Sequence, residues 1–529
     1  MNLDLVLAGA QVVDGTGARG FPADVGIAGA RIVALGDLSA SDAAQRIDVS
    51  GRVVCPGFVD MHAHSDLTLL VRPTGDSKLL QGITTEVNGN CGFSPAPLSD
   101  TSAPTVMQLH GFFGSYVRDL GWDWRSPDEY IARLKSNGLS HHVVLLVGHA
   151  TVRITAMGMA QRPPTAAEVA HMRELIRSAM QAGYFGMSSG LVTPPSVYAD
   201  SDELVELAKV VAADGGMYAT HMRGEGHSLL RATAEALEVG ERSGARVQIS
   251  HHKATFRPYW GRVRQAIQLS EWATARGQLV GFDVYPYTAG SANLTQIIPD
   301  WAHAGGLDQL LERIRQPATR ERIRAEVREQ DREWDQTFVA GVPPGAAQTL
   351  QGQSIAAIAA HRSIDPIDAL FAVLDESAGE AAMVHFVMDE QDVRFVMQHP
   401  LSMFGTDGFG LAPTGVLGRG QPHPRCYGTY PRVLGHYVRE EHVLGLEQAI
   451  RKASYVPAEQ LGLTRKGRVQ VGADADLVVF DAATVIDTAT YAQPHQFPTG
   501  LDYVLVDGQI AAERGKVTQA RAGKVLRRP

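Results

Sequence analysis

Two histidines separated by a single residue, His62 and His64, stand in the segment GFVDMHAH at residues 57–64. Side chains alternate between the two faces of an extended strand, so these two imidazoles point to the same side. A pair with this spacing can chelate one cation. Two histidines in a loop are also common at protein surfaces, so the pair alone leaves a metal site and a surface site equally open.

Four other residues with metal-binding side chains follow predicted strands elsewhere in the chain. Each has an ordinary explanation when taken singly, because a lone cysteine is often a small buried hydrophobe and a strand-end histidine is often just hydrogen-bonded. Taken together with the histidine pair, they form a mixed nitrogen, sulfur and oxygen donor set that suits Zn²⁺. The four residues are Cys91, His221, His251 and Asp407.

The elements that must position these side chains are short apolar strands alternating with amphipathic helices. Helices are predicted at Thr165–Ala182 and at Asp202–Ala213, the second with Ser201 as its N-cap. Eight strands separated by helices favour a (β/α)₈ barrel, and a doubly wound sheet stays the alternative. The predicted strands are Val53–Asp60, Thr84–Asn88, Val143–Val147, Tyr184–Ser188, Met217–Thr220, Val247–Ser250, Leu279–Val284 and Ser402–Thr406.

A barrel explains why residues so distant in sequence would act together. It gathers the carboxyl ends of its strands around one axis, which is where such folds carry their active sites. The histidine pair would come from the first strand, Cys91 from the second, His221 and His251 from the fifth and sixth, and Asp407 from the eighth. The sequence therefore predicts one metal site on the barrel axis.

Both ends of the chain alternate in period two, as antiparallel strands do. We expect residues 1–54 and 465–529 to pair into one small β-sandwich and residues 55–464 to form the barrel. Residues from about 290 to 380 exceed the usual length of a loop and follow the seventh strand. They are expected to form an inserted lid subdomain that covers the site.

Composition excludes several classes of protein. Three cysteines in 529 residues rule out a disulfide framework, and a net charge of −9 gives no basic face for nucleic acid. The N-terminus lacks the pattern of a secretory signal, and no apolar run approaches the length of a membrane span. We expect a soluble cytoplasmic protein that acts on a small molecule; the sequence does not indicate its oligomeric state.

The sequence resembles the amidohydrolase superfamily, and more closely its N-acyl-D-amino-acid deacylase (D-aminoacylase) branch. The matching segments occur in order over essentially the whole chain, and GNCG, SHHK and HPRxYGT together are far more specific than the HxH pair. They are GFVDMHAHSD (57–66), GNCGFSPAP (89–97), SSGLVTPPSVYAD (188–200), THMRGEG (220–226), SHHK (250–253), DVYPYTAGS (283–291), TDG (406–408), HPRCYGTYPRVLG (423–435) and GADADLVVFD (472–481).

This resemblance implies a distorted TIM barrel, a β-sandwich from both termini and catalytic zinc. It assigns Cys91, His221 and His251 to one tight zinc, while His62, His64 and Asp407 border a second, weaker position. It favours His251 over its neighbour His252 as the ligand. Many members of the superfamily bridge two metals with a carboxylated lysine, but no lysine stands at the end of predicted strand three or four.

The same resemblance assigns the substrate α-carboxylate to Lys253, Tyr285 and Arg425. Two cations and a phenol are suitable donors for that group. Tyr287 competes with Tyr285 for this role, and its other interpretation is core packing. Asp407 is expected to take a proton from water and pass it to the departing nitrogen.

We therefore predict zinc-dependent hydrolysis of N-acyl-D-amino acids to a carboxylate and a free D-amino acid. Residues 288–301 are expected near the substrate side chain and hold no Lys or Arg, which favours apolar side chains; these residues could instead pack the lid. One departure limits the transfer of specificity, because many relatives have Tyr where this chain has Thr193. The alternatives are a deacylase of N-acyl-D-Glu or N-acyl-D-Asp, a cyclic-amide hydrolase of the hydantoinase or dihydroorotase kind, and a metal-storing barrel without catalysis.

Overall fold

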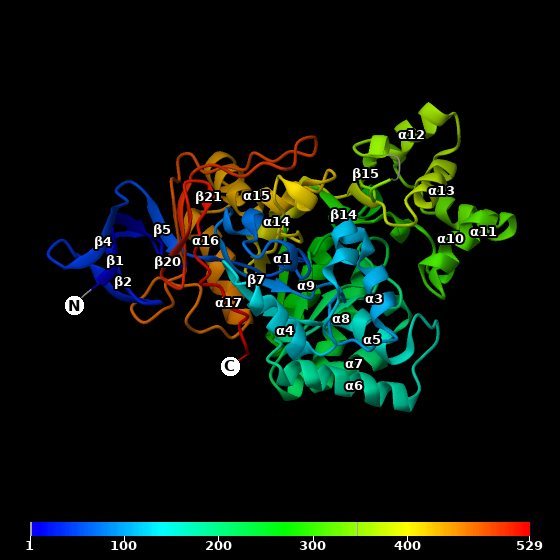
Figure 1. The fold of residues 1–529 in the computed structure, drawn as a ribbon, viewed down its shortest axis with the longest axis horizontal. Coiled ribbons are helices and arrows are strands. Elements are labelled where there is room, and N and C mark those ends of the chain that lie inside the picture. Colours follow the sequence, from blue (N-terminus) through cyan, green and yellow to red (C-terminus); the bar gives the residue numbers. More distant parts are fainter. Residues whose placement is uncertain (1–2, 346–347, 529) are drawn as a thin grey trace.

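The computed structural model describes residues 3–345 and 348–528. Three parts follow one another across the molecule: a β-sheet domain at the end that carries the N-terminus, a central α/β barrel, and a helical lobe at the opposite end (Figure 1). The helical lobe contains α10–α13 and therefore lies within the insert that the sequence predicts after the seventh barrel strand.

Strands from both ends of the chain share one nine-stranded sheet. Its order is β21-β20-β19-β18-β5-β1-β2-β3, with β4 paired to β1. The N- and C-terminal strands meet where β5 runs antiparallel to β18, which confirms that the two ends pair. The strands are β1 (Leu3–Val12), β2 (Phe21–Ala28), β3 (Arg31–Gly36), β4 (Ala43–Asp48), β5 (Val53–Pro56), β18 (Leu477–Phe480), β19 (Leu501–Val506), β20 (Gln509–Glu513) and β21 (Lys516–Val517).

The predicted strand Val53–Asp60 was wrong as a single element. It is two strands, β5 in the sheet domain and β6 (Phe58–Asp60) in the barrel. Pro56 has no N–H to donate to a ladder. At Gly57 the chain passes so close to the next strand that a Cβ would lie 2.1 Å from Thr84 Oγ1. The chain therefore leaves one sheet and enters the other at this proline–glycine pair.

Parallel strands surround the barrel axis, in the order that the sequence predicted. Two sheets make up this ring, β6-β7-β8 and β9-β10-β11-β12-β13-β17. The two sheets are joined by Met61 N, which donates to Phe404 O at 3.3 Å, and by Phe185 N, which donates to Leu145 O at 2.8 Å. The strands after β6 are β7 (Ile83–Asn88), β8 (His142–Leu145) with β9 (Val147–Gly148), β10 (Gly186–Gly190), β11 (Met217–His221), β12 (Arg246–Ile249), β13 (Val280–Val284) and β17 (Ser402–Phe404).

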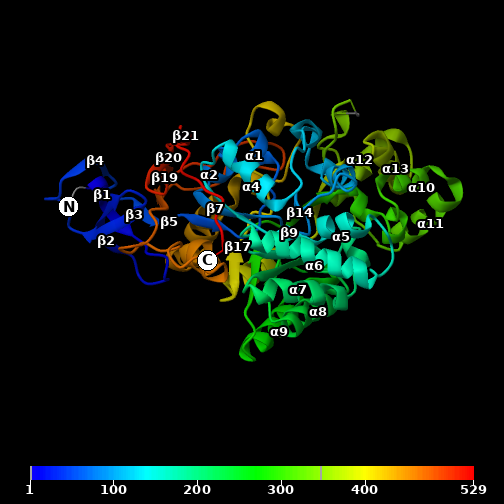
Figure 2. The same cartoon turned by 60° about the horizontal axis from the view of Figure 1, so that its bottom comes forward.

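Helices pack around the outside of these strands (Figure 2). Helix α6 (Ala166–Gln181) starts at Thr165, whose side chain and that of Glu168 form a capping box. Helix α7 (Ser201–Ala213) is capped by Asp200 and not by Ser201 as predicted, since the Asp200 carboxylate accepts from Glu203 N. The others that cover the ring are α4 (Pro127–Ser136), α8 (Leu229–Ser243), α9 (Val263–Ala275) and α14 (Glu390–Gln398).

Short helices stand in the loops around the ring. They connect the strands to the elements outside the barrel and, near the carboxyl ends of the strands, border the candidate site. These helices are α1 (Thr68–Val71), α2 (Asp76–Leu79), α3 (Ala103–Leu109), α5 (His149–Met157), α15 (Arg425–Arg432), α16 (Leu446–Ile450) and α17 (Val456–Gln460).

The insert after β13 forms a lobe with its own apolar core. A three-stranded antiparallel sheet of β14 (Ala289–Asn293), β16 (Ala382–Phe386) and β15 (Thr337–Gly341) carries four helices. Leu294 and Ile297 are fully buried in this core together with Ile298. The apolar run that the sequence placed near the substrate thus mainly packs the insert. The helices are α10 (Leu307–Arg315), α11 (Pro317–Arg328), α12 (Ile355–Arg362) and α13 (Pro366–Glu376).

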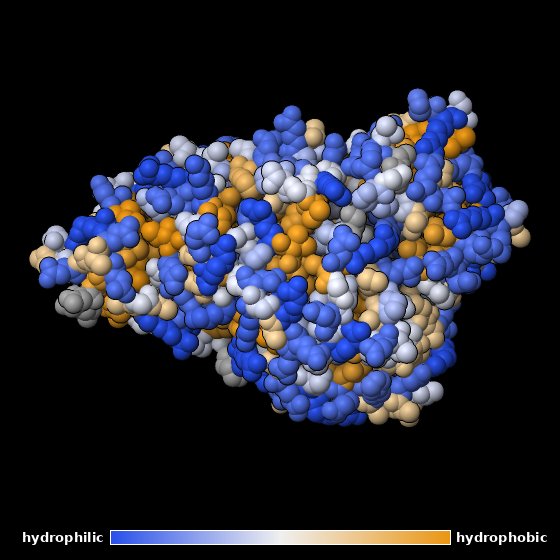
Figure 3. Space-filling view, viewed as in Figure 1, coloured by the Kyte–Doolittle hydropathy of each residue, from blue (hydrophilic) through white to orange (hydrophobic). Residues whose placement is uncertain are grey.

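The face of the molecule seen in Figure 3 is predominantly hydrophilic, with separate smaller hydrophobic areas. Within residues 3–345 and 348–528, no helix combines the length and the apolar character needed to cross a membrane.

Candidate metal centre and substrate site

The sulfur of Cys91 lies at the centre of three imidazoles. It is 3.3 Å from His62 Nε2, 3.6 Å from His251 Nε2 and 3.8 Å from His221 Nδ1. The potential ligand atoms of Cys91, His221 and His251 lie within 4.8 Å of one another. The structure thus brings together the three side chains that the resemblance assigns to a tight zinc.

A second group of donors adjoins the first and contains the predicted general base. Asp407 Oδ1 lies 3.1 Å from His64 Nε2 and 3.5 Å from His62 Nε2. Potential ligand atoms of His62, His251 and Asp407 also fall within 4.8 Å of one another. Both groups lie at the carboxyl ends of their strands, where a barrel collects residues that are distant in sequence.

Three of these residues have an unusual backbone. Cys91, His251 and Asp407 have φ angles of 54°, 35° and 47°, in the left-handed region that residues with a Cβ rarely adopt. Such strain concentrates at functional sites, where the surrounding structure maintains it. Gly190 at the end of β10 makes room for the Cys91 turn, because a Cβ there would lie 2.1 Å from Cys91 O.

The cysteine and the aspartate of the donor set are held in their ionised forms. Burial raises the pKa of the Cys91 thiol, but the positive charge of His62 and hydrogen bonding to His221 and His251 bring that pKa well below its usual value. Burial likewise disfavours the charged carboxylate of Asp407, yet Arg425 and His62 hold the pKa of that carboxyl well below its usual range. A thiolate, imidazoles and a carboxylate are the ligands that zinc takes in proteins. The residues present therefore fit a zinc ion.

Two carboxylates that the sequence argument did not single out orient the ligands. Asp283 Oδ1 lies 3.2 Å from His62 Nδ1, and it accepts from the backbone N–H of His251 at 2.8 Å. Glu225 Oε1 lies 2.9 Å from His251 Nδ1 and pairs with Lys253. Partners on the second ring nitrogen fix the tautomer and the direction of a metal-binding histidine. Both acids stand in segments of the family resemblance, DVYPYTAGS and THMRGEG, so the signal was present.

A buried lysine fixes the backbone on both sides of Asp407. Lys78, on α2, is 0% exposed, and its ammonium donates to Asp60 Oδ2 at 2.7 Å and to Gly408 O at 2.9 Å. It also donates to Thr406 Oγ1, while Asp60 accepts from the Thr406 N–H at 2.8 Å. These contacts hold the chain on both sides of Asp407. No strand-end pattern marks this residue, so the sequence did not predict its role.

Of the three residues predicted to bind a carboxylate, Lys253 and Arg425 both lie near the ring of the third, Tyr285. Lys253 Nζ lies 5.8 Å and the guanidinium carbon of Arg425 4.7 Å from the centre of the Tyr285 ring. Tyr287 lies instead under Arg432, at 5.0 Å. Tyr285, and not Tyr287, therefore lies close to both predicted cations.

The guanidinium of Arg425 is buried with unused donors. Arg425 is 3% exposed, and an Nη atom lies 2.8 Å from Asp407 Oδ2. This contact is an ion pair through Nη1, and within the described part of the chain neither Nε nor Nη1 has a hydrogen-bond partner. A buried donor without a partner is costly unless a ligand supplies the acceptor.

Comparison with known proteins identifies the family. Residues 45–512 match the pattern of the amidohydrolase family. The chain belongs to this family. It is 37% identical to the D-aminoacylase of Alcaligenes xylosoxydans xylosoxydans over 99% of this chain and 98% of that protein. It is also 37% identical to the N-acyl-D-glutamate deacylase of the same organism, over 99% of this chain and 97% of that protein.

Two solved structures share the fold of this amidohydrolase over its whole length. A D-aminoacylase studied for the role of its binuclear metal centre has a TM-score of 0.83 at 35% identity, covering 99% of this chain and 100% of that one. The N-acyl-D-glutamate deacylase of Bordetella bronchiseptica, in complex with zinc and a phosphonate inhibitor that mimics the tetrahedral intermediate, has a TM-score of 0.82 at 34% identity. That match covers 100% of both chains. The fold is the TIM-barrel-like fold of these amidohydrolases, with its sheet domain.

Two pockets of the amidohydrolase lie between the barrel and the insert. The large pocket, of about 350 Å³, has Arg425 and His423 in its wall and extends between barrel loops and the insert segment that follows β15. The small pocket, of about 80 Å³, lies between the β10 loop, α3 and the start of the insert. Thr193 and Ile298 line the small pocket, and no Lys or Arg is among its lining residues in the described structure.

His252 takes no part in the donor groups. Its ring packs 5.3 Å from that of Phe282 on β13, and burial lowers the pKa of His252 to about 3. Both of its ring nitrogens are buried without a hydrogen-bond partner among the described residues, so His252 packs against Phe282 and lies outside both donor groups.

Proposed function

We propose that this amidohydrolase hydrolyses the amide bond of N-acyl-D-amino acids with the help of zinc. One juxtaposition carries the proposal: Asp407 lies between a Cys/His donor group and a buried arginine with unused donors. The first is suited to a metal and the second to a carboxylate. The likeness to D-aminoacylase and to N-acyl-D-glutamate deacylase over the whole chain supports the D configuration of the substrate.

In this proposal Cys91, His221 and His251 hold the tight zinc, and His62, His64 and Asp407 border a weaker second position. A bound zinc ion activates water as a nucleophile near neutral pH and polarises a carbonyl. Cys91 is then a ligand and not a nucleophile, because its thiolate is occupied. Asp283 and Glu225 keep His62 and His251 in the orientation that this requires.

The remaining steps belong to the side chains of this protein. Lys253, Tyr285 and Arg425 bind the α-carboxylate and so fix the amide beside Asp407. Asp407 takes a proton from the attacking water and delivers it to the departing nitrogen as the C–N bond breaks. The products are a carboxylate and a free D-amino acid.

Substrates with apolar side chains are still expected to be preferred, and the reason is now the lining of the small pocket. We assign the substrate side chain to the small pocket, whose described lining holds Met159, Val192 and Leu307 together with Ile298. The charged group in that lining is Asp300, which would repel an acidic side chain. The N-acyl-D-Glu deacylase activity of one relative is the competing specificity.

A substrate panel combined with metal analysis tests the proposal. We expect zinc in the purified protein, hydrolysis of N-acetyl-D-Leu, loss of activity with a chelator, and no hydrolysis of N-acetyl-L-Leu or hydantoin. Faster hydrolysis of hydantoin would favour the cyclic-amide alternative. Zinc without any hydrolysis would favour a storage role, and faster hydrolysis of N-acetyl-D-Glu than of N-acetyl-D-Leu would overturn the assigned side-chain preference.

A further inference from the structure

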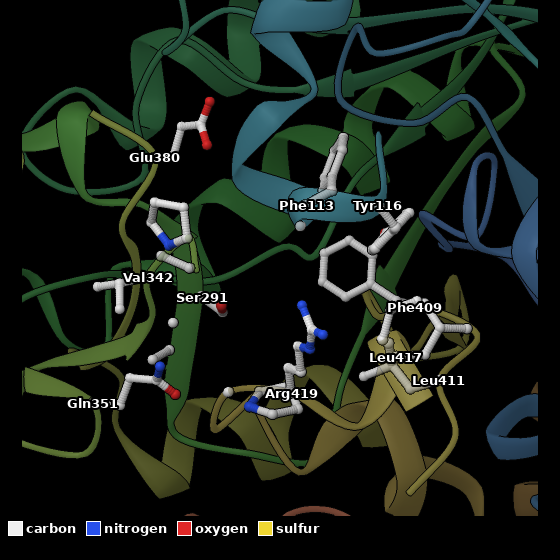
Figure 4. A pocket seen from close by; sticks show the side chains of 18 of the residues that line it. Phe113, Tyr116, Ser291, Val342, Gln351, Glu380, Phe409, Leu411, Leu417 and Arg419 are labelled. Carbon is white, nitrogen blue, oxygen red and sulfur yellow. The ribbon is translucent and has the colours of Figure 1, made fainter. Parts of the chain in front are cut away.

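The large pocket begins beside the candidate metal centre and has an apolar wall. The rings of Phe113 and Phe409 lie 5.9 and 6.1 Å from that of His64, and both residues line the pocket. Tyr116, Leu411 and Leu417 continue the wall on the same side (Figure 4). A carbon chain that starts at the amide can follow this wall without losing contact with apolar surface.

In the described structure the pocket contains one cationic side chain, that of Arg419, without a neutralising carboxylate beside it. Arg419 is exposed, and its guanidinium points into the space between Phe409 and Leu417 on one side and Val342 and Gln351 on the other (Figure 4). Among the described residues no carboxylate forms an ion pair with Arg419. The acidic lining residue, Glu380, is already paired with Arg118.

The α-carboxylate, the side chain and the acyl group of the substrate each need a separate binding site around the scissile amide. In the function proposed above, the α-carboxylate meets Lys253, Tyr285 and Arg425, and the side chain enters the small pocket. The remaining group of the substrate is the acyl group, and we assign it to the remaining pocket, the large one beside His64. A cation in the acyl pocket is of no use to an acetyl or a plain alkanoyl group, which carries no charge to meet it.

We propose that Arg419 binds a second carboxylate at the far end of the acyl group. The preferred substrates are then N-acyl-D-amino acids whose acyl part is a dicarboxylic acid, such as N-succinyl- or N-glutaryl-D-Leu. Water adds across the amide, the C–N bond breaks, and the nitrogen receives the proton, giving a diacid and a D-amino acid. An Arg–carboxylate pair can be bidentate, which adds geometric selectivity to its charge. This inference rests on the proposed function.

The test compares matched substrates in the wild-type holoenzyme and two variants. N-succinyl-D-Leu carries the acyl carboxylate, N-pentanoyl-D-Leu has a chain of similar length without it, and N-acetyl-D-Glu carries its extra carboxylate on the side chain. Arg419→Gln removes the pocket cation. Arg231→Gln is the control, because Arg231 is an exposed arginine on α8 and no lining residue of either pocket.

We expect the wild type to prefer N-succinyl- over N-pentanoyl-D-Leu, and Arg419→Gln to lower kcat/KM for N-succinyl-D-Leu by about fivefold, mainly through KM. N-pentanoyl-D-Leu should change by less than about twofold, since it makes no ion pair to lose. Raising the salt concentration should weaken the wild-type preference but leave the variant unchanged. Arg231→Gln should behave as the wild type.

Other results would overturn the inference. A loss confined to N-acetyl-D-Glu would mean that Arg419 meets the side chain and not the acyl group. An equal loss for all three substrates, or the same loss in Arg231→Gln, would mean that the positive charge only attracts anions in general. If N-pentanoyl-D-Leu is hydrolysed and N-succinyl-D-Leu is no better, the inference fails while the deacylase stands; if neither these nor N-acetyl-D-Leu is hydrolysed, the proposed function itself fails.

Discussion

Asp407 Oδ2 lies 2.8 Å from an Nη atom of Arg425, so the proposed general base and the proposed carboxylate-binding cation face each other directly. A substrate α-carboxylate that binds Arg425 has to share this guanidinium with Asp407. Removing Arg425 would therefore disturb both binding and proton transfer. Removing a donor that contacts only the substrate would disturb binding alone.

Tyr285 and Tyr287 form a matched pair for this distinction. Both are buried, at 2% and 4% exposure, but only Tyr285 lies close to both Lys253 and Arg425. Tyr285→Phe should raise KM by about 10-fold or more, the value of a hydrogen bond to a charged group, with kcat changed little. Tyr287→Phe should leave KM unchanged, because the Tyr287 hydroxyl has no hydrogen-bond partner among the described residues. Steady-state kinetics with N-acetyl-D-Leu decide, and equal effects of the two variants would remove Tyr285 from the substrate site.

Asp407→Asn keeps the size of the side chain and removes its basicity. Turnover should fall by about 10²–10⁴-fold, the usual contribution of general acid–base catalysis. Zinc content should stay near that of the wild type, since Cys91, His221 and His251 are untouched. Elemental analysis and kcat are measured on the same preparation. Normal turnover would exclude Asp407 as the base, and loss of all zinc would make it a ligand of the tight ion.

Cys91→Ala, unlike Asp407→Asn, should lose the zinc. It removes the atom around which His62, His221 and His251 are arranged, so the purified protein should lose most of its zinc and its activity together. Cys55→Ala is the control, since Cys55 is also buried but stands on β5 of the sheet domain. The zinc-to-protein ratio after dialysis is the measurement. A Cys91→Ala variant that keeps its zinc would contradict the assignment.

The positions of the ligands could be predicted because they depend on local patterns. His221 is the last residue of β11, and Cys91 and His251 closely follow β7 and β12, so identifying the strands was enough to bring them together. The alternation of strands and helices likewise predicted the ring. The apolar run over residues 53–60 concealed the break between two sheets, although the Pro56-Gly57 pair at that point is a turn signal in the sequence.

Other features depend on packing between distant segments and have no local signature. Asp283 and Glu225 stand in segments of the family resemblance, but their contacts with His62 and His251 appear only once the strands are packed together. The apolar run from Leu294 to Ile298 reads equally well as a substrate pocket or as a core, and the structure makes it mainly the core of the insert. The contacts of Lys78 with Thr406 and Gly408 join residues that lie 328 and 330 positions apart in the sequence.

The ammonium of Lys78 is enclosed together with Asp60, and both residues are 0% exposed. Its hydrogen bonds connect the end of β6 to the turn that carries Asp407. Lys78→Met leaves the Asp60 carboxylate buried without its cation, which should cost about 3–5 kcal/mol of unfolding free energy. Lys135→Met is the control, since Lys135 is exposed on α4 and should change stability by less than about 0.5 kcal/mol.

Urea unfolding of both variants, followed by fluorescence and by circular dichroism, measures the difference. The folded fraction of Lys78→Met should also lose turnover while it keeps the zinc of the Cys91 group, because the residue that moves is Asp407. A variant as stable and as active as the wild type would show that Asp60 finds other partners through the N–H and hydroxyl of Thr406, and that the lysine does not position the base.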